Sequence, residues 1–380
     1  MNYKIFAVSV EKICVYDKKG LPLHEKYTMM KRTLLIFACL LMALTGFAQR
    51  VIVVKANDVE SLLDAVKQAN KMNVSRHSER LYILIPDGLY DMGEQVLTRI
   101  SGHNIAFIGQ SMEKTIIRNA PAKENEGISK TAIFQNRGLN NYFQDLTLTN
   151  ELDYYTLGND GRAVTLQDKG KHTIYNRIRM LSHQDTYYAD KEDAQHYMQD
   201  TEIHGTVDFI CGAGDIWFER CRLVTEKRSA DGSGENVIVA TRTAETHWGY
   251  VFNRCTIENR VSNFYYARAW HTYPRCVWLR TTLLNPDKLM PSRFDTQGMK
   301  VAENYFKEYR TKDVNGKDIT PKSNVLTFTV DNCPPYSEET IMTDAEAKQY
   351  TMKNIFGDWK PAKQLKKIEK QANKLKQQML

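Results

Sequence analysis

Two aspartates occupy equivalent places in successive segments of the chain. Asp185 lies ten residues after Tyr175, and Asp208 lies ten residues after Met198. Tyr175 and Met198 each begin the same short apolar pattern, so the carboxyl groups are neighbours if the segments are adjacent parallel strands, about 4.7–4.9 Å apart. Like charges that close raise the pKa of one carboxyl and leave the other ionised, which suits one acid and one base or nucleophile. The alternative is that both aspartates only make local hydrogen bonds in turns, as most isolated aspartates do.

The apolar pattern that places these aspartates repeats along the chain. It consists of a large apolar residue, a small or apolar residue three positions later, and another apolar residue two positions after that. The six occurrences begin at Phe143, Tyr175, Met198, Phe218, Phe252 and Leu279. Their starts are 32, 23, 20, 34 and 27 residues apart, which excludes helical repeats of fixed period.

Irregular spacing is typical of a parallel β-helix, whose coils keep their strands while the turns between them vary in length. Inward residues of successive coils stack, which accounts for Cys221 and Cys255 at the same position of the pattern. A large β-sandwich is the alternative, but sandwiches favour short hairpin connections. We therefore expect an all-β fold, a single right-handed parallel β-helix (solenoid) over residues 49–362.

Two helices are expected beside the strands. A short N-terminal helix covers residues 59–70, with Asp58 as its N-cap. A lysine-rich C-terminal helix covers residues 363–380, where apolar residues recur at spacings of three and four. Its apolar positions are Leu365, Ile368, Ala372, Leu375 and Met379. Two heptads are too few for a coiled coil, so we expect this stripe to lie on the outer face of the β-helix.

The first 48 residues have the layout of a targeting segment. Lysine and arginine follow Met30, an apolar run covers residues 34–44, and small residues come just before residue 49. This order is typical of a secretory signal peptide over residues 30–48, and the run is too short to span a bilayer comfortably. Residues 1–29 are then an upstream extension produced by a mis-called start. We expect an exported protein, periplasmic or secreted, with no membrane span in the mature chain.

Charge and cysteine usage exclude several functional classes. The chain carries 52 Lys and Arg against 45 Asp and Glu, but the excess lies at its two ends, and the body from 49 to 362 is nearly neutral. A neutral body argues against a nucleic-acid partner. Five cysteines follow residue 48, an odd number that cannot pair completely, and we expect most of them in the core. No Cys/His cluster indicates a zinc site, and we expect no metal and no cofactor.

Three motifs resemble those of the pectin methylesterases. The sequence SHQDT at 182–186 is similar to the family motif G-x-Q-D-T, GTVDFICG at 205–212 to G-x-V-D-F-I-F-G, and YARAW at 266–270 to L-G-R-P-W. Three separated motifs in the family's order are a specific signal, and the resemblance covers about residues 51–361. It implies a right-handed parallel β-helix and a monomeric esterase. The implied reaction removes methyl esters from galacturonate units of pectin or homogalacturonan oligosaccharides.

The resemblance also implies a role for each matching residue. Asp208 is the expected nucleophile, Asp185 the expected acid and base, and Gln184 the expected donor to the oxyanion. Arg268 is expected to orient Asp208 and keep it ionised, and Trp270 to pack against a sugar ring. Without the motifs, the arginine and the tryptophan would be read as a surface ion pair and a core aromatic.

Three departures from the family pattern bear on the expected site. Arg162 stands where a second oxyanion glutamine is usual, and Gln167 cannot replace it because it faces the other way in an alternating strand. An arginine there would lower the pKa of nearby aspartates and threatens the proton of Asp185. Cys211 replaces an aromatic residue, and Ala269 replaces a proline. The alternative function is therefore a non-catalytic, or altered-specificity, carbohydrate-binding β-helix.

Other hydrolytic chemistries fit the sequence less well. A serine hydrolase using Ser182 and His183 is excluded because adjacent strand residues point apart. Polysaccharide lyases with parallel β-helices generally use a calcium cluster of acidic residues, and no dense acidic group is present. Neighbouring carboxylates also suit a retaining glycosidase. The spacing does not exclude that enzyme, but the Gln-Asp and Arg-x-Trp context does.

Overall fold

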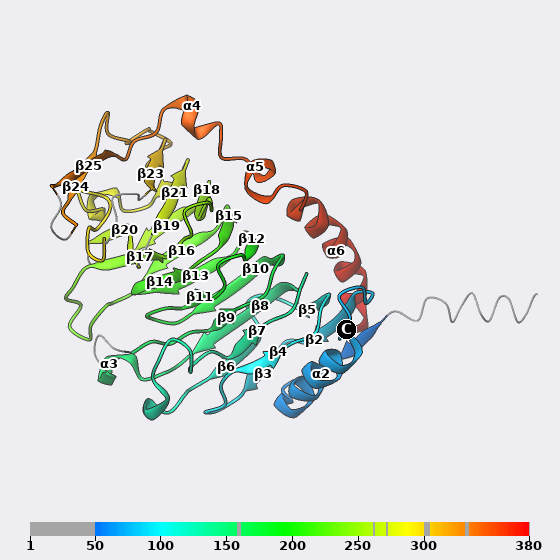
Figure 1. Ribbon diagram of the computed structural model, residues 1–380. Coiled ribbons are helices and arrows are strands. Elements are labelled where there is room, and N and C mark those ends of the chain that lie inside the picture. The colour runs from blue at the N-terminus through cyan, green and yellow to red at the C-terminus, as the bar shows by residue number, and fades with distance from the viewer. Residues whose placement is uncertain are drawn as a thin grey trace, which may run out of the picture. The chain divides into compact units, whose positions relative to one another are not determined.

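Parallel strands stacked coil upon coil form the body of the protein (Figure 1). The computed structural model describes residues 50–157, 161–260, 263–270, 273–299, 305–330 and 334–379. The predicted upstream extension and signal peptide lie outside these residues. Within the unit Val51–Leu380, the strand order gives three long faces, and the prediction of a parallel β-helix is confirmed.

One continuous sheet bends to form two of these faces. The first face contains β1 (Val51–Val53), β2 (Leu81–Ile85), β5 (Ile105–Gly109), β8 (Tyr142–Asn150), β10 (Thr173–Leu181), β12 (Gln195–Gln199), β15 (Asp215–Glu219), β18 (Tyr250–Asn253), β21 (Arg275–Leu279) and β23 (Tyr305–Tyr309). The second contains β3 (Gly88–Asp91), β6 (Thr115–Asn119), β13 (Glu202–Gly205), β16 (Arg222–Thr225), β19 (Thr256–Asn259) and β22 (Thr282–Leu283). The long strands β8 and β10 belong to both faces, because their second halves pair with β6 and β13.

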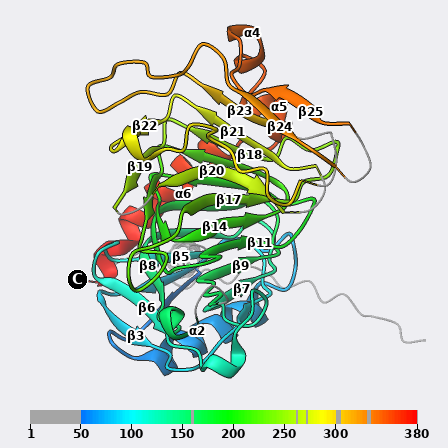
Figure 2. The ribbon, with the colours of Figure 1, turned by 90° about the vertical axis from the view of Figure 1, so that its left-hand side faces the viewer.

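A separate sheet makes the third face, which Figure 2 shows as a stack running from β7 to β20. It contains β4 (Thr98–Ile100), β7 (Phe134–Asn136), β9 (Leu166–Asp168), β11 (Tyr187–Ala189), β14 (Val207–Gly212), β17 (Asn236–Thr241) and β20 (Phe264–Ala269). A small antiparallel pair, β24 (Val325–Phe328) and β25 (Tyr336–Glu339), follows the last coil. Short 3-10 turns lie at Lys123–Asn125, Pro286–Lys288 and Lys376–Met379.

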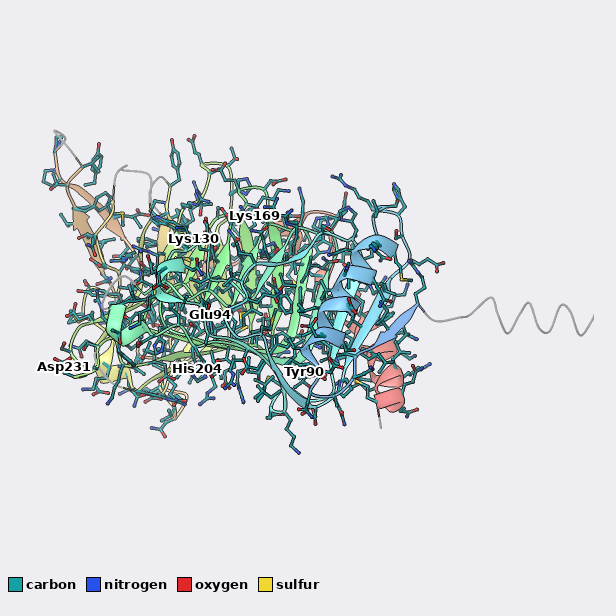
Figure 3. All side chains as sticks on the ribbon, turned by 90° about the horizontal axis from the view of Figure 1, so that it is seen from below. Tyr90, Glu94, Lys130, Lys169, His204 and Asp231 are labelled. Carbon is teal, nitrogen blue, oxygen red and sulfur yellow. The ribbon has the colours of Figure 1, made fainter. Side chains whose placement is uncertain are left out.

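Side chains pack the space enclosed by the strands (Figure 3). Aromatic rings stack from coil to coil, with centroid separations of 4.2 Å for Phe218 and Phe252 and 4.1 Å for Phe252 and Trp278. Cys221 and Cys255 are buried in the same interior cluster. The four described cysteines that follow residue 48 are all buried and free, as expected of core residues, and Cys333 lies outside the described residues.

The register confirms five of the six predicted repeats and corrects the last. Tyr175 pairs with Phe143 and Met198, and the ladder continues through Phe218 and Phe252. The next partner of Phe252 is Trp278, so the repeat predicted from Leu279 is wrong by one residue. Leu279 instead packs in an apolar cluster on the outer side of the sheet. Because this strand is apolar on both faces, the hydrophobic pattern alone could not fix its phase.

Left-handed backbone conformations mark the corner between the first two faces. The residues at this corner are Asp145, Arg177, Asp200, Arg220, Arg254 and Arg280, all with φ between 50° and 56°. Residues with a β-carbon rarely adopt positive φ. The conformation recurs on coil after coil because the parallel ladder continues on both sides of the bend.

Helices cover the N-terminal end and part of the outer surface. Helix α2 (Val59–Met72) buries Leu62, Ala65, Val66 and Ala69. Its first turn is capped as predicted, since the Asp58 carboxylate accepts a hydrogen bond from the Ser61 amide at 2.9 Å. Three short helices, α3 (Tyr154–Leu157), α4 (Asp344–Ala347) and α5 (Met352–Phe356), lie later in the chain. No helix in the described ranges is long and apolar enough to cross a membrane.

Helix α6 (Pro361–Leu375) packs against the outer side of the first face, the position expected from its apolar stripe (Figure 1). It begins two residues before the predicted boundary, because proline is well suited to the first position of a helix. Leu365, Ile368, Ala372 and Leu375 are buried with Tyr142 and Ile174 of the sheet. Ion pairs from Glu369 to Arg177 and from Lys376 to Asp145 add polar contacts along the seam.

Replacing Ile368 with alanine tests this docking. Ile368 is only 4% exposed, so Ile368→Ala should lower the free energy of unfolding by ~2–5 kcal/mol, because it removes buried methylene groups and leaves a cavity. The exposed neighbour Lys367 is the matched control, and Lys367→Ala should change stability by less than ~0.5 kcal/mol. Urea denaturation measures both. Equal stabilities of the two variants would show that α6 does not bury its apolar stripe in solution.

Candidate active site

All six residues singled out in the sequence line one cleft on the third face. They are Arg162, Gln184, Asp185, Asp208, Arg268 and Trp270, and the cleft has a volume of about 310 Å³. They lie in or next to β9, β11, β14 and β20, which belong to one sheet in which β17 separates β14 from β20. Ile128, Cys211, Ala240, Gln297 and Gly298 complete much of the lining.

The two aspartates lie level with each other on adjacent coils. Tyr187 pairs with Ile210, and Asp185 and Asp208 each precede their half of that pair by two residues. Both have positive φ, 59° for Asp185 and 51° for Asp208. Such a conformation costs energy, and at functional sites it persists because the surrounding structure holds it.

Backbone contacts between the coils hold these two turns together. The Thr186 hydroxyl donates a hydrogen bond to the carbonyl oxygen of His204 at 2.8 Å, and the Thr206 amide donates to the carbonyl oxygen of His183 at 2.9 Å. A β-carbon at Gly205 would lie 2.5 Å from that His183 oxygen and 2.1 Å from the Phe209 β-carbon. Only glycine allows this close approach, which explains the residue type at position 205.

A bidentate ion pair joins Arg268 to Asp208. The Arg268 Nε donates to Asp208 Oδ1 at 2.8 Å, and its Nη2 donates to Asp208 Oδ2. Its remaining nitrogen, Nη1, donates to Gln297 Oε1 at 2.6 Å. Burial raises the pKa of Asp208, and the Arg268 guanidinium acts against that rise. The fork therefore fixes the orientation of Asp208 and favours its ionised form.

Asp185 lies in a more apolar setting. It is 5% exposed and lines the cleft beside Cys211 and Ala240, which belong to a small buried apolar cluster with Val164. Burial raises the pKa of Asp185 well above its usual range, and the charge of Asp208 raises it further, while Arg162 and Arg268 lower it. Of these two close carboxyls, Asp185 is therefore the one whose surroundings favour the protonated form.

Arg162 and Gln184 are neighbours on adjacent coils. They form a parallel bridge, and the Ala163 amide donates to the Gln184 carbonyl oxygen at 3.0 Å. The Arg162 guanidinium is paired with Glu126, with Nη1 2.8 Å from Oε1. That carboxylate offsets the positive charge, so Arg162 opposes the proton on Asp185 less than a lone arginine would. The Gln184 side-chain amide makes no hydrogen bond to any residue within the described ranges, which leaves its N–H groups available to a ligand.

Three residues that the motifs did not include also shape the cleft. The Tyr188 and Trp270 rings are 5.8 Å apart, and the Arg242 guanidinium lies 5.2 Å from the Trp270 ring centroid. The third is Gln297, which holds Arg268. Tyr188 could have been predicted from the repeat. It lies three residues after Asp185, as Cys211 lies three residues after Asp208, and the two residues pair in the sheet. Gln297 lies in an irregular segment that carries no pattern.

Gln167 lies outside the lining of the cleft, in agreement with the sequence analysis. Its side chain accepts a hydrogen bond from Gln135 at 2.7 Å and donates one to Asp190 at 2.9 Å. It is fully buried in these contacts. The amide next to the two aspartates is therefore that of Gln184. Among the described residues, no group of three or more His, Cys, Asp or Glu side chains is placed to hold a metal ion.

The proteins of known sequence or structure that this chain resembles are named as pectinesterases or pectin methylesterases. Pectinesterase 2 from Citrus sinensis is 25% identical over 301 residues, covering 73% of this chain and 55% of the relative. Probable pectinesterase 50 from Arabidopsis thaliana is 26% identical over 228 residues, covering 58% and 60%. The matches thus span less than two thirds of either relative.

Solved structures give the same picture of the fold. Pectin methylesterase PemA from Erwinia chrysanthemi superposes with a TM-score of 0.63 at 21% identity, covering 82% of this chain and 97% of that one. Pectin methylesterase from carrot superposes with a TM-score of 0.64 at 21% identity, covering 82% and 95%. The family model for Pectinesterase matches residues 51–357, which is most of the sequence. The chain therefore belongs to the pectinesterase family.

Proposed function

We propose that this protein is a carboxylic ester hydrolase that removes methyl esters from galacturonate units of pectin. The observation that carries the proposal is the asymmetry of the two aspartates. One is held by the Arg268 fork, and the other lies in an apolar setting that favours its protonated form. A nucleophile and an acid side by side are the two groups that ester cleavage requires.

The reaction proceeds in two steps. A carboxylate oxygen of Asp208 attacks the ester carbonyl carbon, and the carbon–oxygen bond to the methoxy group breaks. The departing methoxy oxygen takes the proton of Asp185, which releases methanol and leaves an acyl-enzyme anhydride. A water molecule then attacks the galacturonate carbonyl carbon while Asp185, now a carboxylate, accepts one of its protons. The bond from that carbon to the Asp208 oxygen breaks, which frees the Asp208 carboxylate. The galacturonate product leaves with both aspartates in their starting states.

The oxyanion that develops in each step is stabilised by hydrogen-bond donors beside Asp185. The unoccupied side-chain N–H of Gln184 is the first donor, since an amide fixed before the reaction needs no reorganisation. Arg162 supplies a second group at the place of the family's glutamine, with its charge reduced by Glu126. Trp270, braced by Tyr188 and Arg242, packs against a sugar ring through its face.

The site of action follows from the size of the substrate. Pectin is a polymer that an enzyme meets outside the cell, which fits the export predicted from residues 30–48. We propose that the mature protein acts there as a monomer on the polymer or on homogalacturonan oligosaccharides. A solved pectin methylesterase in complex with a hexasaccharide supports this substrate class. The second candidate, a carbohydrate-binding β-helix without turnover, is favoured by the arginine at position 162.

Replacing Asp208 with asparagine tests the nucleophile. Asp208→Asn should reduce methanol release from highly methylated pectin by at least ~10³-fold, because the amide cannot form the acyl-enzyme. Asp287→Asn is the matched control, since the Asp287 side chain is 73% exposed and remote from the cleft lining. Pectin binding and thermal melting should be retained in both variants. A folded Asp208→Asn variant with full activity would refute the assignment, and a wild-type protein that binds pectin without releasing methanol would support the second candidate.

The proton on Asp185 can be tested by stability alone. Because the pKa of Asp185 is raised in the folded state, the folded protein binds this proton more tightly than the unfolded chain does. Its stabilising effect is complete below the unfolded pKa of about 3.9 and is lost as the pH rises through the folded pKa.

The Asp185→Asn variant lacks this titration. Its stability relative to the wild type should therefore increase with pH above about 4, by up to ~1.4 kcal/mol per pH unit, until Asp185 ionises in the folded wild type. Denaturant unfolding from pH 4 to pH 8 measures the difference. The same comparison for the exposed control, Asp287→Asn, should give a flat line. A flat line for Asp185→Asn would mean that Asp185 is ionised in the folded protein throughout this range.

Replacing Arg162 with glutamine restores the family's arrangement of two neutral donors. Arg162→Gln should raise methanol release on ordinary pectin. It should also move the alkaline limb of the pH profile upward, because the arginine lowers the pKa of Asp185. The double variant Arg162→Gln with Glu126→Gln controls for the partner left unpaired. Unchanged or lower activity in both folded variants would show that this enzyme uses Arg162 itself.

A further inference from the structure

A second cavity of about 420 Å³ lies beside β21 and β23, on the side covered by helices α4 and α5. It shares no lining residue with the cleft. Its lining includes three half-buried aromatic residues, Trp248, Tyr305 and Tyr350, together with Arg275. Figure 1 shows how the segment from α4 to α5 runs along this part of the solenoid. The proposed ester hydrolysis does not use any of these groups.

The three aromatic rings lie next to one another around Tyr350, and each keeps part of its surface exposed. Trp248 and Tyr350 meet edge to face at 5.4 Å, and Tyr305 and Tyr350 are 6.4 Å apart. All three pack against the outer apolar cluster while keeping part of their surface exposed. Aromatic faces of this kind bury the C–H face of a sugar ring, and the phenol and indole groups supply polar edges.

Arg275 is the unusual member of the lining. Its guanidinium carbon lies 5.8 Å from the centroid of the Tyr305 ring, but the side chain makes no hydrogen bond or ion pair in the described part of the chain. Its Nε atom is buried without a partner. Because Nε is closed to solvent, a ligand can pair only with the other nitrogens of this half-buried guanidinium. A carboxylate is the ligand group whose two oxygens match the guanidinium fork.

The other charged groups near the cavity already have partners or are exposed. Glu346 accepts hydrogen bonds from the Thr343 amide at 2.7 Å and from the Thr343 hydroxyl at 2.8 Å. His247 is 3.2 Å from Asp215, and Lys307, on the same Tyr305 ring as Arg275, pairs with Glu338 at 2.8 Å. Glu245 is exposed. Arg275 is therefore the cation in this described lining that an acidic ligand can engage.

We propose that this cavity binds an acidic sugar, a uronate whose carboxylate pairs with Arg275 and whose ring packs on Trp248. The choice of a uronate rests on the proposed function, since each ester cleaved in the cleft becomes a galacturonate carboxylate. A methyl ester carries no charge and cannot form the same two-point ion pair. The cavity therefore selects the product of the reaction over its substrate and holds de-esterified chain on a surface apart from the cleft.

Fluorine NMR of the 5-fluorotryptophan-labelled protein tests this site separately from the cleft. The chain has five tryptophans; Trp270 lines the cleft and Trp248 lines the second cavity. The full chain carrying Asp208→Asn is titrated with digalacturonate and with its dimethyl ester, so that the ester is not consumed. We expect a saturable shift of the Trp248 resonance with digalacturonate, and binding at least tenfold weaker for the dimethyl ester.

Arginine variants identify the group that recognises the carboxylate. Arg275→Gln should weaken the Trp248 response to digalacturonate at least tenfold, and Arg275→Lys, which keeps the charge but not the fork, should weaken it less. Arg254→Gln is the matched control, because Arg254 is exposed and lines neither cavity, and it should leave the response unchanged.

The outcomes separate this inference from the proposed function. If digalacturonate shifts the Trp270 resonance but not the Trp248 resonance, the inference is overturned and the esterase proposal stays intact. Equal responses of Trp248 to the acid and the ester, or an unchanged response in both Arg275 variants, would overturn it as well. Failure of the esterase proposal would show itself elsewhere, as a wild-type protein that releases no methanol from pectin. In that case a Trp248 response that depends on Arg275 would still establish an acidic-sugar site.

Discussion

Backbone pairing between successive parallel coils is the constraint on which the candidate site depends. Asp185 and Asp208 are 23 residues apart in the sequence, yet the pairing of Tyr187 with Ile210 makes them neighbours. The same ladder sets the left-handed backbone at both aspartates and the close approach at Gly205. A strained turn is stable here because the coils above and below define its position. The pairing of the coils therefore holds the two carboxyl groups together, against their mutual repulsion, before any substrate binds.

The chemistry then depends on treating two identical side chains differently. Asp208 accepts two hydrogen bonds from the guanidinium of Arg268, whereas Asp185 lies beside small apolar residues and the charge of Asp208. The substitution at position 162 adds a cation to this balance, and the structure contains its compensation in Glu126. The effect of a charged substitution in a site therefore has to be judged together with the partner that accompanies it. Arg162 was expected to threaten the proton on Asp185, but burial and the charge of Asp208 raise the pKa of Asp185 by more than Arg162 lowers it.

Much of the fold and of the cleft could be predicted from the sequence because both depend on local, repeated patterns. Five repeats predicted strands of the first face, the three motifs predicted five of the cleft residues, and Arg162 was identified by its place at a family glutamine's position. The sixth repeat failed because β21 is apolar on both sides, so periodicity left its phase open. Gln297, Arg242 and the cavity around Arg275 were missed for another reason. They involve side chains from different coils, some in irregular turns and some at the starts of strands, and only the three-dimensional path of the chain brings these together.

The outer apolar cluster explains why the C-terminal helices pack on the β-helix, since they bury apolar residues of its first face. In a β-helix the inner face of every strand is buried by the other faces, while the outer face normally meets water. Here the first face also carries apolar residues outward, among them Ile108, Tyr142 and Ile174, and a patch of this kind left exposed would favour association. Helix α6 covers it with an apolar stripe and the ion pair of Glu369, and Lys376, just after the helix, adds a second ion pair. Further along the same face, α4 and α5 cover the surface less completely, and the cavity containing Arg275 lies there. The partial cover there leaves the half-buried aromatic residues and Arg275 lining a cavity, whereas α6 buries the apolar residues that it contacts.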